Sequence, residues 1–277
     1  MLFTLLGGDA RMVILCRRLR ADGHTVIPFA MEQALPDCAG TAPEALAGAE
    51  CVLLPLPCER DGVLNAPFSA LRCPLGALLE AVRPGTILCA GAPGEALRRR
   101  CEERGLDLRD YAAGERFALR NARLTAEGAL ALLRNALPRP LEGSAVLVVG
   151  YGRIGRILAE LLAAQGARVT VAARNPLARA EAEAHGCAAL PPEAAAAPGF
   201  DAVVNTVPAI LYREAELTGF GPALLLELAS PPYGFDPAAA RALGKEILFA
   251  PGLPGKTAPE SAAEAIQEGI YAALSIP

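Results

Sequence analysis

The chain contains 277 residues, of which 53% are hydrophobic and 20% are charged, and its formal net charge is −4. This length suits two compact domains, and this composition excludes a disordered chain and predicts no binding of nucleic acid. No apolar run approaches the roughly 20 residues that span a bilayer, and no basic leader or cleavage site precedes Gly7, so we expect a cytoplasmic protein without a membrane partner.

Cysteine and histidine usage limits the chemistry further. The 8 cysteines are scattered without a Cys-x-x-Cys pair, which predicts reduced, mostly buried thiols and no metal site. The 2 histidines, His24 and His185, each lie in a turn beside a glycine. We expect neither to act as an acid or base, which disfavours the histidine-based proton transfer of 2-hydroxy-acid dehydrogenases.

The first elements in chain order are a strand, a helix and a returning strand, predicted at residues 2–6, 11–20 and 25–30. Gly7, Gly8 and Asp9 form the turn before the helix, where a carboxylate stabilises the helix dipole but repels a pyrophosphate. Two interpretations of Asp9 stay open. It caps the helix, or residues 7–11 line one wall of a substrate cleft in which Arg11 meets an anionic substrate.

The rest of this first half also alternates strands with helices. Strands are predicted at residues 51–56 and 86–90, and helices at residues 73–82 and 93–104. Prolines predict a long loop at residues 59–67. A helix at residues 125–137 and a last helix at residues 258–274 are predicted to bridge the two halves of the molecule.

The most informative pattern is a glycine-rich turn in the middle of the chain. The sequence Gly150-Tyr151-Gly152-Arg153-Ile154-Gly155 follows an apolar strand at residues 144–149 and opens a helix at residues 153–165. The first glycine allows a tight turn, the second lets the backbone approach a pyrophosphate, and the third lets the helix pack close to the sheet. A returning strand at residues 168–173 completes the unit. This context predicts a dinucleotide site with the helix N-terminus facing the phosphates.

The end of that returning strand bears on the choice of cofactor. A protein that selects NAD usually places Asp or Glu there to bind the ribose hydroxyls, whereas this chain has Ala173-Arg174-Asn175. A guanidinium at Arg174 suits a 2′-phosphate, with Arg153 or Arg179 as helpers. We therefore expect NADP in preference to NAD, unless Arg174 is simply a solvated residue after a strand.

Two more apolar runs, at residues 201–207 and 223–229, predict strands of a parallel sheet that is covered on both faces. The sequence Asn205-Thr206-Val207-Pro208 and, after the second run, Ser230 lie at the carboxyl ends of these strands. Doubly wound sheets bind their ligands along that edge. We expect these residues beside the nicotinamide ribose, although Ser230 also suits a plain loop.

A Gly/Pro-rich segment at residues 250–257 precedes the last predicted helix. It is too elaborate for a simple connection. Lys256 and Thr257 offer a cation and a helix N-terminus to a carboxylate, so we expect this segment to bind a ligand.

The chain repeats its strand–turn–helix pattern at an offset of 143 residues, so that Gly7 corresponds to Gly150. Asp9 and Met12 stand where the second and third glycines of the later copy stand. We therefore expect the first copy to hold no dinucleotide.

These patterns together predict an α/β fold of two doubly wound Rossmann-like units with parallel sheets, joined by bridging helices and an interdomain cleft. Residues 1–120 plus 258–277 are expected to form a substrate or partner domain. Residues 121–257 are expected to form the NAD(P)-binding domain.

With these segments in place, the chain resembles the family of dipicolinate synthase A subunits over essentially its whole length. The fingerprint alone would suit many families, whereas further blocks in this order are specific. The blocks are Gly7-Gly8-Asp9-Ala10-Arg11, Glu115-Arg116, Thr125-Ala126-Glu127-Gly128, the glycine fingerprint, Ala173-Arg174, Asn205-Thr206-Val207-Pro208, Leu228-Ala229-Ser230, and Ala250-Pro251-Gly252-Leu253-Pro254-Gly255 with Ala258-Pro259.

The resemblance implies NADP-dependent oxidation of a dihydro- or tetrahydrodipicolinate-type precursor to dipicolinate, the pyridine-2,6-dicarboxylate of bacterial spores. It also implies a partner, the flavin-binding B subunit of dipicolinate synthase, which would carry FMN. The setting that it implies is the mother-cell cytoplasm during sporulation. Whether the chain also forms a homo-oligomer stays open.

Such a reaction passes a hydride to the nicotinamide and a proton to a base, while two carboxylates are held in place. The residues expected to bind the substrate are Arg11, Arg116, Thr125, Ser230, Lys256 and Thr257. Glu127, on the predicted bridging helix, is the expected base, with Asp9 as the alternative.

Two other functions stay open at this point. An NADP-dependent dehydrogenase of the shikimate or amino-acid type would share the architecture but act on another carboxylate. A nucleotide-sensing regulatory module would bind NAD(P) without hydride transfer, and it would not need Glu127 or the Gly/Pro-rich segment.

Overall fold

The computed structural model describes residues 1–276, and the chain divides into two compact units. The N-terminal unit comprises Met1–Asn121 and Ala258–Pro277, and the second unit comprises Ala122–Thr257. The first boundary falls inside the long helix α5 (Glu115–Ala136), and the second lies directly before helix α11 (Pro259–Leu274). Each unit has the α/β architecture that the sequence predicts.

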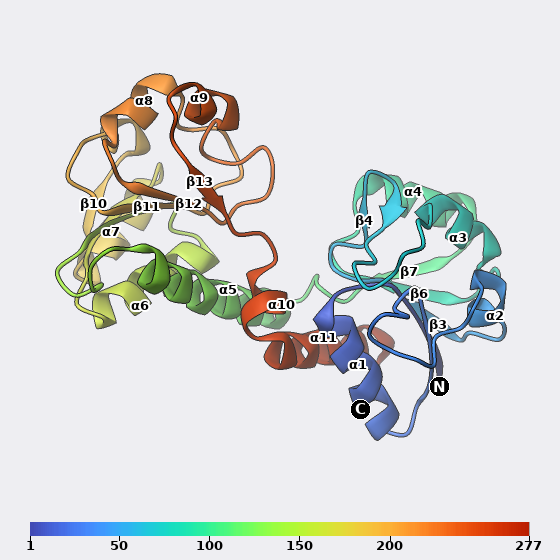
Figure 1. Ribbon diagram of the computed structural model, residues 1–277. Helices are drawn as coiled ribbons and strands as arrows, with labels where there is room; N and C mark the ends of the chain where they lie inside the picture. Colours follow the sequence, from blue (N-terminus) through green and yellow to red (C-terminus); the bar gives the residue numbers. More distant parts are fainter. Residues whose placement is uncertain (277) are drawn as a thin grey trace. The chain divides into compact units, whose positions relative to one another are not determined.

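Five parallel strands form the main sheet of the N-terminal unit, in the order β2-β1-β3-β6-β7 (Figure 1). The strands are β1 (Leu2–Leu6), β2 (Thr25–Phe29), β3 (Cys51–Leu53), β6 (Ile87–Ala90) and β7 (Asp107–Asp110). The helices of this unit besides α5 and α11 are α1 (Ala10–Ala21), α2 (Ala42–Leu46), α3 (Leu75–Ala81) and α4 (Glu95–Glu103). The chain winds outward from β1 in both directions, as in a doubly wound fold.

Six parallel strands form the sheet of the second unit, in the order β10-β9-β8-β11-β12-β13 (Figure 1). The strands are β8 (Ala145–Val149), β9 (Arg168–Ala172), β10 (Ala188–Leu190), β11 (Ala202–Asn205), β12 (Leu224–Glu227) and β13 (Ile247–Phe249). Its other helices are α6 (Arg153–Ala164), α7 (Pro176–Ala184), the 3-10 helix η1 (Pro192–Ala194), α8 (Glu214–Gly219), α9 (Pro237–Ala242) and α10 (Leu253–Thr257). The order reverses between β8 and β11, and ligands of such sheets bind outside the carboxyl ends of the strands at that point.

The apolar character of the central strands follows from packing on both faces of each sheet. In β8, Val146 and Val148 join one buried hydrophobic cluster, whereas Leu147 and Val149 join another. Successive side chains of a strand point to opposite faces, so a sheet covered on both faces needs apolar residues at every position. The continuous apolar run therefore predicts this strand correctly.

The internal repeat is exact in the structure at the level of secondary structure. Strand β8, helix α6 and strand β9 begin 143 residues after β1, α1 and β2, respectively, and each has the same length as its counterpart. The two units thus share the strand–helix–strand arrangement that the glycine positions predict.

Several elements differ from the sequence-based expectations. The predicted loop at residues 59–67 contains a small antiparallel hairpin of β4 (Glu59–Arg60) and β5 (Val63–Leu64). Helix α5 begins ten residues before the predicted start at residue 125. The segment at residues 250–257 is not all loop, because its second half forms α10.

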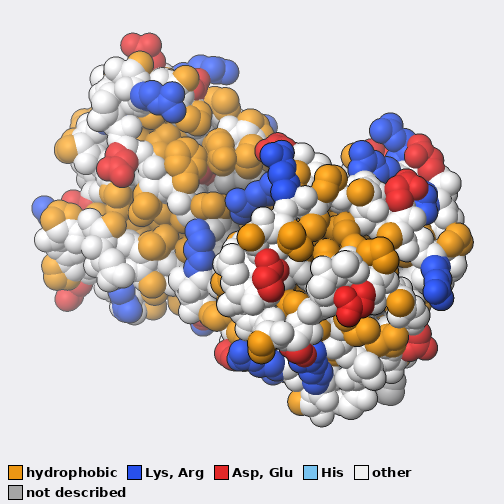
Figure 2. Space-filling view, turned by 45° about the vertical axis from the view of Figure 1, so that its right-hand side comes forward, with side chains coloured by type: hydrophobic (Ala, Val, Ile, Leu, Met, Phe, Trp, Pro, Cys, Tyr) orange, Lys and Arg blue, Asp and Glu red, His pale blue; other side chains and the backbone are white. Residues whose placement is uncertain are grey.

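Charged side chains of both signs lie close together on the face shown in Figure 2. The face in Figure 2 carries Lys and Arg side chains beside Asp and Glu, with hydrophobic side chains between them. Ion pairs between side chains of opposite sign include Arg20–Asp37 and Arg104–Glu80. Among the helices of residues 1–276, none combines the length and apolar character that a membrane crossing needs.

Two buried tyrosines give a matched pair of stability predictions. The Tyr111 hydroxyl donates to the Leu54 carbonyl at 3.1 Å, whereas the Tyr212 hydroxyl has no hydrogen-bond partner among the described residues. We expect Tyr212→Phe to raise the free energy of unfolding of the second unit by about 1 kcal/mol, because it removes an unsatisfied buried hydroxyl. Tyr111→Phe should lower that of the N-terminal unit by about 1 kcal/mol. Urea denaturation curves test both, and a Tyr212→Phe protein less stable than wild type contradicts the account.

Candidate functional site

The glycine-rich turn between β8 and α6 brings a helix unusually close to a strand. Gly150 has a φ of 93°, in the left-handed region that favours glycine, and a Cβ there would lie 2.5 Å from Oγ1 of Thr206. A Cβ on Gly155 would lie 2.1 Å from the carbonyl oxygen of Gly150. The first and third glycines are therefore required by the packing of α6 on this turn.

Gly152 has a different role, because it leaves space. It is the N-cap residue of α6, it is exposed, and a Cβ there would meet nothing within 4 Å. The N–H groups of a first helical turn lack partners within the helix, and no side chain caps them here. This uncapped, open helix N-terminus fits a phosphate group.

The other residues of the turn have structural contacts. Tyr151 is buried, and its hydroxyl lies 3.3 Å from Nδ1 of His185. The guanidinium of Arg156 lies over the Tyr151 ring and forms an ion pair with Glu181 at 2.6 Å. These contacts hold the outer side of the turn and the start of α6.

At the end of β9, one arginine is committed to the backbone and another is exposed. Arg179 donates to the carbonyl oxygens of Ala173 and Arg174, at 2.8 and 2.9 Å. The side chain of Asn175 caps α7 by accepting from the Leu177 N–H at 2.9 Å. Arg179 thus shapes this corner, and Arg174 is the exposed cation on it.

The carboxyl ends of β11 and β12 hold a buried polar pair. Asn205 is fully buried, and its Nδ2 donates to Oε1 of Glu227 at 2.6 Å and to the Val207 carbonyl at 2.9 Å. Thr206 donates from Oγ1 to the Val149 carbonyl at 2.8 Å, directly before the glycine turn. Asn205 and Thr206 therefore hold the loop that supports the turn, and their polar groups are already paired.

Glu227 is the residue that the sequence interpretation missed. The run at residues 223–229 is not wholly apolar, because Glu227 lies within it and is 1% exposed. Burial raises the pKa of its carboxyl above the usual value, against the effect of its hydrogen bonds. The signal in the sequence is a single carboxylate within an otherwise apolar strand. The structure aligns this residue with Asn205 on the neighbouring strand.

In the N-terminal unit, Asp9 occupies the position that corresponds to Gly152 and caps the N-terminus of α1 with its side chain. Its carboxylate accepts from the Arg11 N–H at 3.1 Å and pairs with the Arg11 guanidinium at 2.8 Å. Arg11 is buried, and it donates further to the Leu56 carbonyl. This geometry is that of a helix cap, one of the two interpretations of Asp9. The guanidinium of Arg11, which we expect to meet a substrate, is paired with Asp9 instead.

Helix α5 carries three of the predicted residues. Arg116 is exposed and pairs with Glu268 of α11 at 3.2 Å. Thr125 is buried. Glu127 is 45% exposed and pairs through one oxygen with Arg123, one helical turn earlier, at 2.6 Å.

The remaining predicted substrate residues lie in loops and short elements of the second unit. Lys256 and Thr257 are exposed on α10, and the Thr257 hydroxyl donates to the Leu253 carbonyl at 2.9 Å. A Cβ on Gly128 would lie 2.9 Å from that hydroxyl oxygen, so α10 packs on α5 through a glycine. Ser230 is exposed, and its carbonyl accepts from the Tyr233 N–H at 3.1 Å.

The predicted residues thus form two groups. All predicted cofactor contacts lie in the second unit, at or next to the carboxyl ends of β8, β9 and β11. The predicted substrate and proton-transfer residues are distributed over both units, with Asp9, Arg11 and Arg116 in the N-terminal unit. No group of His, Cys, Asp or Glu side chains within residues 1–276 is arranged to hold a metal ion.

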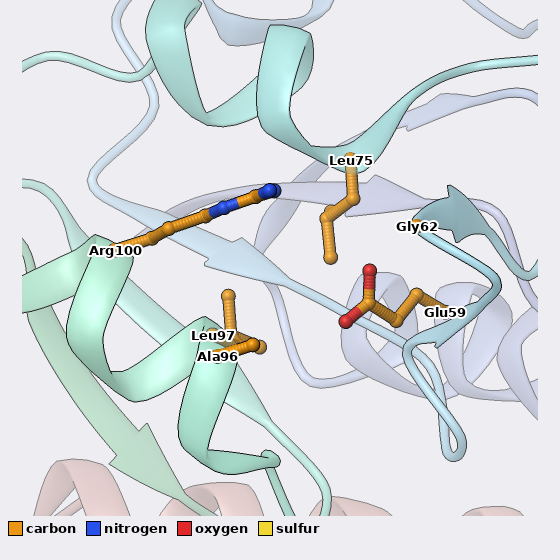
Figure 3. Close-up of a pocket in the computed structure, with 6 residues that line it drawn as sticks. All are labelled: Glu59, Gly62, Leu75, Ala96, Leu97 and Arg100. Atoms are coloured by element: carbon orange, nitrogen blue, oxygen red, sulfur yellow. The ribbon is translucent and has the colours of Figure 1, made fainter.

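A small pocket of about 200 Å³ lies in the N-terminal unit, away from all predicted residues. Its lining residues are Glu59, Gly62, Leu75, Ala96, Leu97 and Arg100. In Figure 3 the side chains of Glu59 and Arg100 enter it from opposite sides. It is smaller than the pockets that bind most small ligands and far too small for a dinucleotide.

Two family models match successive parts of the chain. Residues 2–112 match the N-terminal domain of the dipicolinate synthase A subunit. Residues 112–211 match the NAD binding domain of the D-isomer specific 2-hydroxyacid dehydrogenases. The second unit therefore carries a dehydrogenase-type domain, which supports a nicotinamide cofactor.

Individual relatives agree with these matches. The dipicolinate synthase A subunit of Bacillus subtilis (strain 168) is 34% identical over 151 residues, which cover 53% of this chain and only 51% of that protein. The crystal structure of the dipicolinate synthase A subunit from Bacillus halodurans is 25% identical and has a TM-score of 0.87, covering 100% of this chain and 98% of that one. The crystal structure of the A chain of dipicolinate synthase from Bacillus subtilis is also 25% identical and has a TM-score of 0.82, covering 99% of this chain and 96% of that one. The similarity to the A subunits of dipicolinate synthases is thus confirmed.

Two glycine substitutions separate packing from ligand binding at the turn. Gly152→Ala places a methyl group in open space at a φ of −84°, so we expect a normal melting temperature. Because that space is where we expect a phosphate group, the methyl group should prevent its hydrogen bonds to the helix and lower the affinity for NADP about tenfold or more. Gly155→Ala forces α6 off the turn, and we expect a lower melting temperature as well. Isothermal titration and thermal unfolding measure the two effects. A Gly152→Ala protein that binds NADP like wild type contradicts the phosphate assignment.

Proposed function

We propose that this protein oxidises a dihydro- or tetrahydrodipicolinate-type precursor to dipicolinate with NADP, as the A subunit of a dipicolinate synthase. The observation that carries the proposal is the open, uncapped helix N-terminus at Gly152, in a dehydrogenase-type unit. The same chain supplies an N-terminal unit of the type found in dipicolinate synthases. Its partner would be a flavin-binding B subunit with FMN, and its setting the mother-cell cytoplasm during sporulation.

The chain's own residues must hold two carboxylates and accept a proton. When bound, the nicotinamide accepts the hydride, and aromatisation of the ring supplies much of the driving force. Arg116 and Lys256 are exposed cations suited to the carboxylates, and Thr125, Ser230 and Thr257 add hydroxyl groups. Because Arg11 is engaged by Asp9, it would bind substrate only by sharing its guanidinium with that carboxylate.

Glu127 is a better base than Asp9 on the evidence of their partners. The Asp9 carboxylate accepts from Arg11 through both oxygens and also caps α1. Glu127 is half exposed and pairs with Arg123 through one oxygen, which leaves the other oxygen for a proton. We therefore assign the proton transfer to Glu127.

Arg174 supports NADP rather than NAD. It is exposed at the end of β9, where a ribose is expected, and no carboxylate occupies the neighbouring positions Ala173 and Asn175. Since Arg179 is bound to backbone carbonyls, Arg174 is the guanidinium suited to a 2′-phosphate.

The reaction is tested by anaerobic incubation of the protein with the enzymatically generated precursor, NADP and the flavin-loaded B subunit. We expect the ultraviolet absorbance of a pyridine dicarboxylate to rise together with that of reduced nicotinamide. A dihydro precursor would yield one reduced nicotinamide per pyridine formed, and a tetrahydro precursor would yield two, because its aromatisation takes two oxidations. Parallel incubations replace the precursor with shikimate or alanine.

The arms of this experiment separate the alternatives. Reduction of NADP with shikimate or alanine, but not with the precursor, indicates a dehydrogenase of the shikimate or amino-acid type. Absence of NADP reduction with every substrate indicates a nucleotide-sensing module. Glu127→Gln should retain NADP affinity but lower turnover about 100-fold, as expected for loss of a general base. An active Glu127→Gln protein removes that residue from the mechanism.

Cofactor choice is tested at Arg174. We expect wild type to bind NADP more tightly than NAD, and Arg174→Ala to lose about tenfold or more in NADP affinity while its NAD affinity stays unchanged. Arg179→Ala is the matched comparison: because its side chain holds the backbone of this corner, we expect it to change the affinities for NADP and NAD by about the same factor. Equal preference in wild type and Arg174→Ala contradicts the assignment.

A further inference from the structure

The second unit contains a buried carboxylate that the proposed mechanism does not use. Both oxygens of Glu227 are hydrogen-bonded, and the side chain is 1% exposed. Oε1 accepts from Asn205 Nδ2 at 2.6 Å and from the Ala229 N–H at 2.9 Å. Oε2 accepts from the N–H groups of Gly234 at 2.8 Å and Phe235 at 3.3 Å.

The orientation of Asn205 indicates that this carboxyl group is ionised. Asn205 Oδ1 accepts from the Val207 N–H at 3.1 Å, and Nδ2 donates to the Val207 carbonyl at 2.9 Å. A flipped amide would lose both bonds, so Nδ2 must face Glu227. All four partners of the carboxyl group then donate, and a protonated carboxyl would have no acceptor for its hydrogen.

The four donors are uncharged, so they stabilise the negative charge without cancelling it. A buried charge in a medium of low dielectric constant acts over a longer distance than an exposed one. After the segment at residues 229–235, the next charged side chain is that of Asp236, the N-cap residue of α9. It forms an ion pair at 3.3 Å with Arg213, the N-cap residue of α8. This pair is close to neutral as a whole.

Glu227 also lies at the ligand-binding edge of the sheet. In the register of the strands, Glu227 is opposite Asn205, and Asn205 is opposite Val149, directly before the glycine turn. Two strand spacings separate the backbones of Glu227 and Val149 by about 10 Å. Its hydrogen bonds also join the segment at residues 229–235 to the end of β11, so this edge is built around the carboxylate.

We propose that the buried charge of Glu227 makes this unit favour the oxidised nicotinamide cofactor over the reduced one. The inference rests on the proposed function, because it requires a nicotinamide at this edge. The oxidised ring carries a positive charge and the reduced ring is neutral, while the rest of the two cofactors is the same. Attraction by the carboxylate therefore acts on one of the two forms. Such a bias favours exchange of the reduced product for fresh oxidised cofactor.

The test compares the dissociation constants of NADP⁺ and NADPH by isothermal titration for wild type and Glu227→Gln. Removal of a buried unit charge from this edge of the sheet should weaken NADP⁺ relative to NADPH by about three- to tenfold. A residue that only holds the loops would change both constants by the same factor and leave their ratio unaltered. The ratio is thus the informative quantity, and it does not depend on turnover.

Two controls accompany this variant. Glu227→Asp keeps the charge on a side chain one methylene shorter, so its ratio should stay close to that of wild type even if both affinities fall. Glu142→Gln removes an exposed charge directly before β8, at the opposite end of the sheet, and should leave the ratio unchanged.

A measurement on the wild-type protein covers the case in which Glu227→Gln does not fold, since its amide would face backbone donors. The ¹³C resonance of the Glu227 carboxyl, identified by its loss in Glu227→Asp, is titrated in the two complexes. By linkage, we expect a lower pKa with NADP⁺ bound than with NADPH. Equal pKa values, or an unaltered ratio in a folded Glu227→Gln protein, overturn the inference. Failure of wild type to bind either cofactor instead refutes the proposed function.

Discussion

The close approach of helix α6 to strand β8 is the constraint on which the rest of the second unit depends. It is possible only because Gly155 presents no side chain to the Gly150 carbonyl, which a Cβ would approach to 2.1 Å. With the helix held there, its uncapped N-terminus opens at Gly152. Thr206 packs against Gly150 and bonds to Val149, so the neighbouring strand end also supports the turn. A few backbone contacts thus leave this helix N-terminus open, in an arrangement that suits an anion.

The N-terminal copy shows how few residues decide whether such a helix start is open or capped. Asp9 replaces Gly152 in the repeat and caps α1 with its own carboxylate, which Arg11 then neutralises. Met12 replaces Gly155, and the chain accommodates it because Gly8 lacks a side chain: a Cβ on Gly8 would lie 2.3 Å from Met12 Cγ. The two units share a framework but differ in chemistry, and fold alone does not fix function.

Local patterns in the sequence predicted the elements that depend on local causes. The glycine spacing and the buried apolar runs identified β8, α6 and β9 to within a residue or two, because turn geometry and burial on both faces dictate those residue types. The sequence predicts a loop where the hairpin of β4 and β5 lies, since two-residue strands carry no periodicity. The engagement of Arg11 by Asp9 and the pairing of Asn205 with Glu227 depend on side-chain contacts that no spacing reveals.

A crystal structure of the protein with NADP⁺ tests the central claim most directly. The account predicts pyrophosphate density at the turn from Gly150 to Gly155, with phosphate oxygens within hydrogen-bond distance of the first N–H groups of α6. Density at the corresponding turn of the N-terminal unit, around Asp9, or an empty glycine turn at saturating NADP⁺ would contradict it.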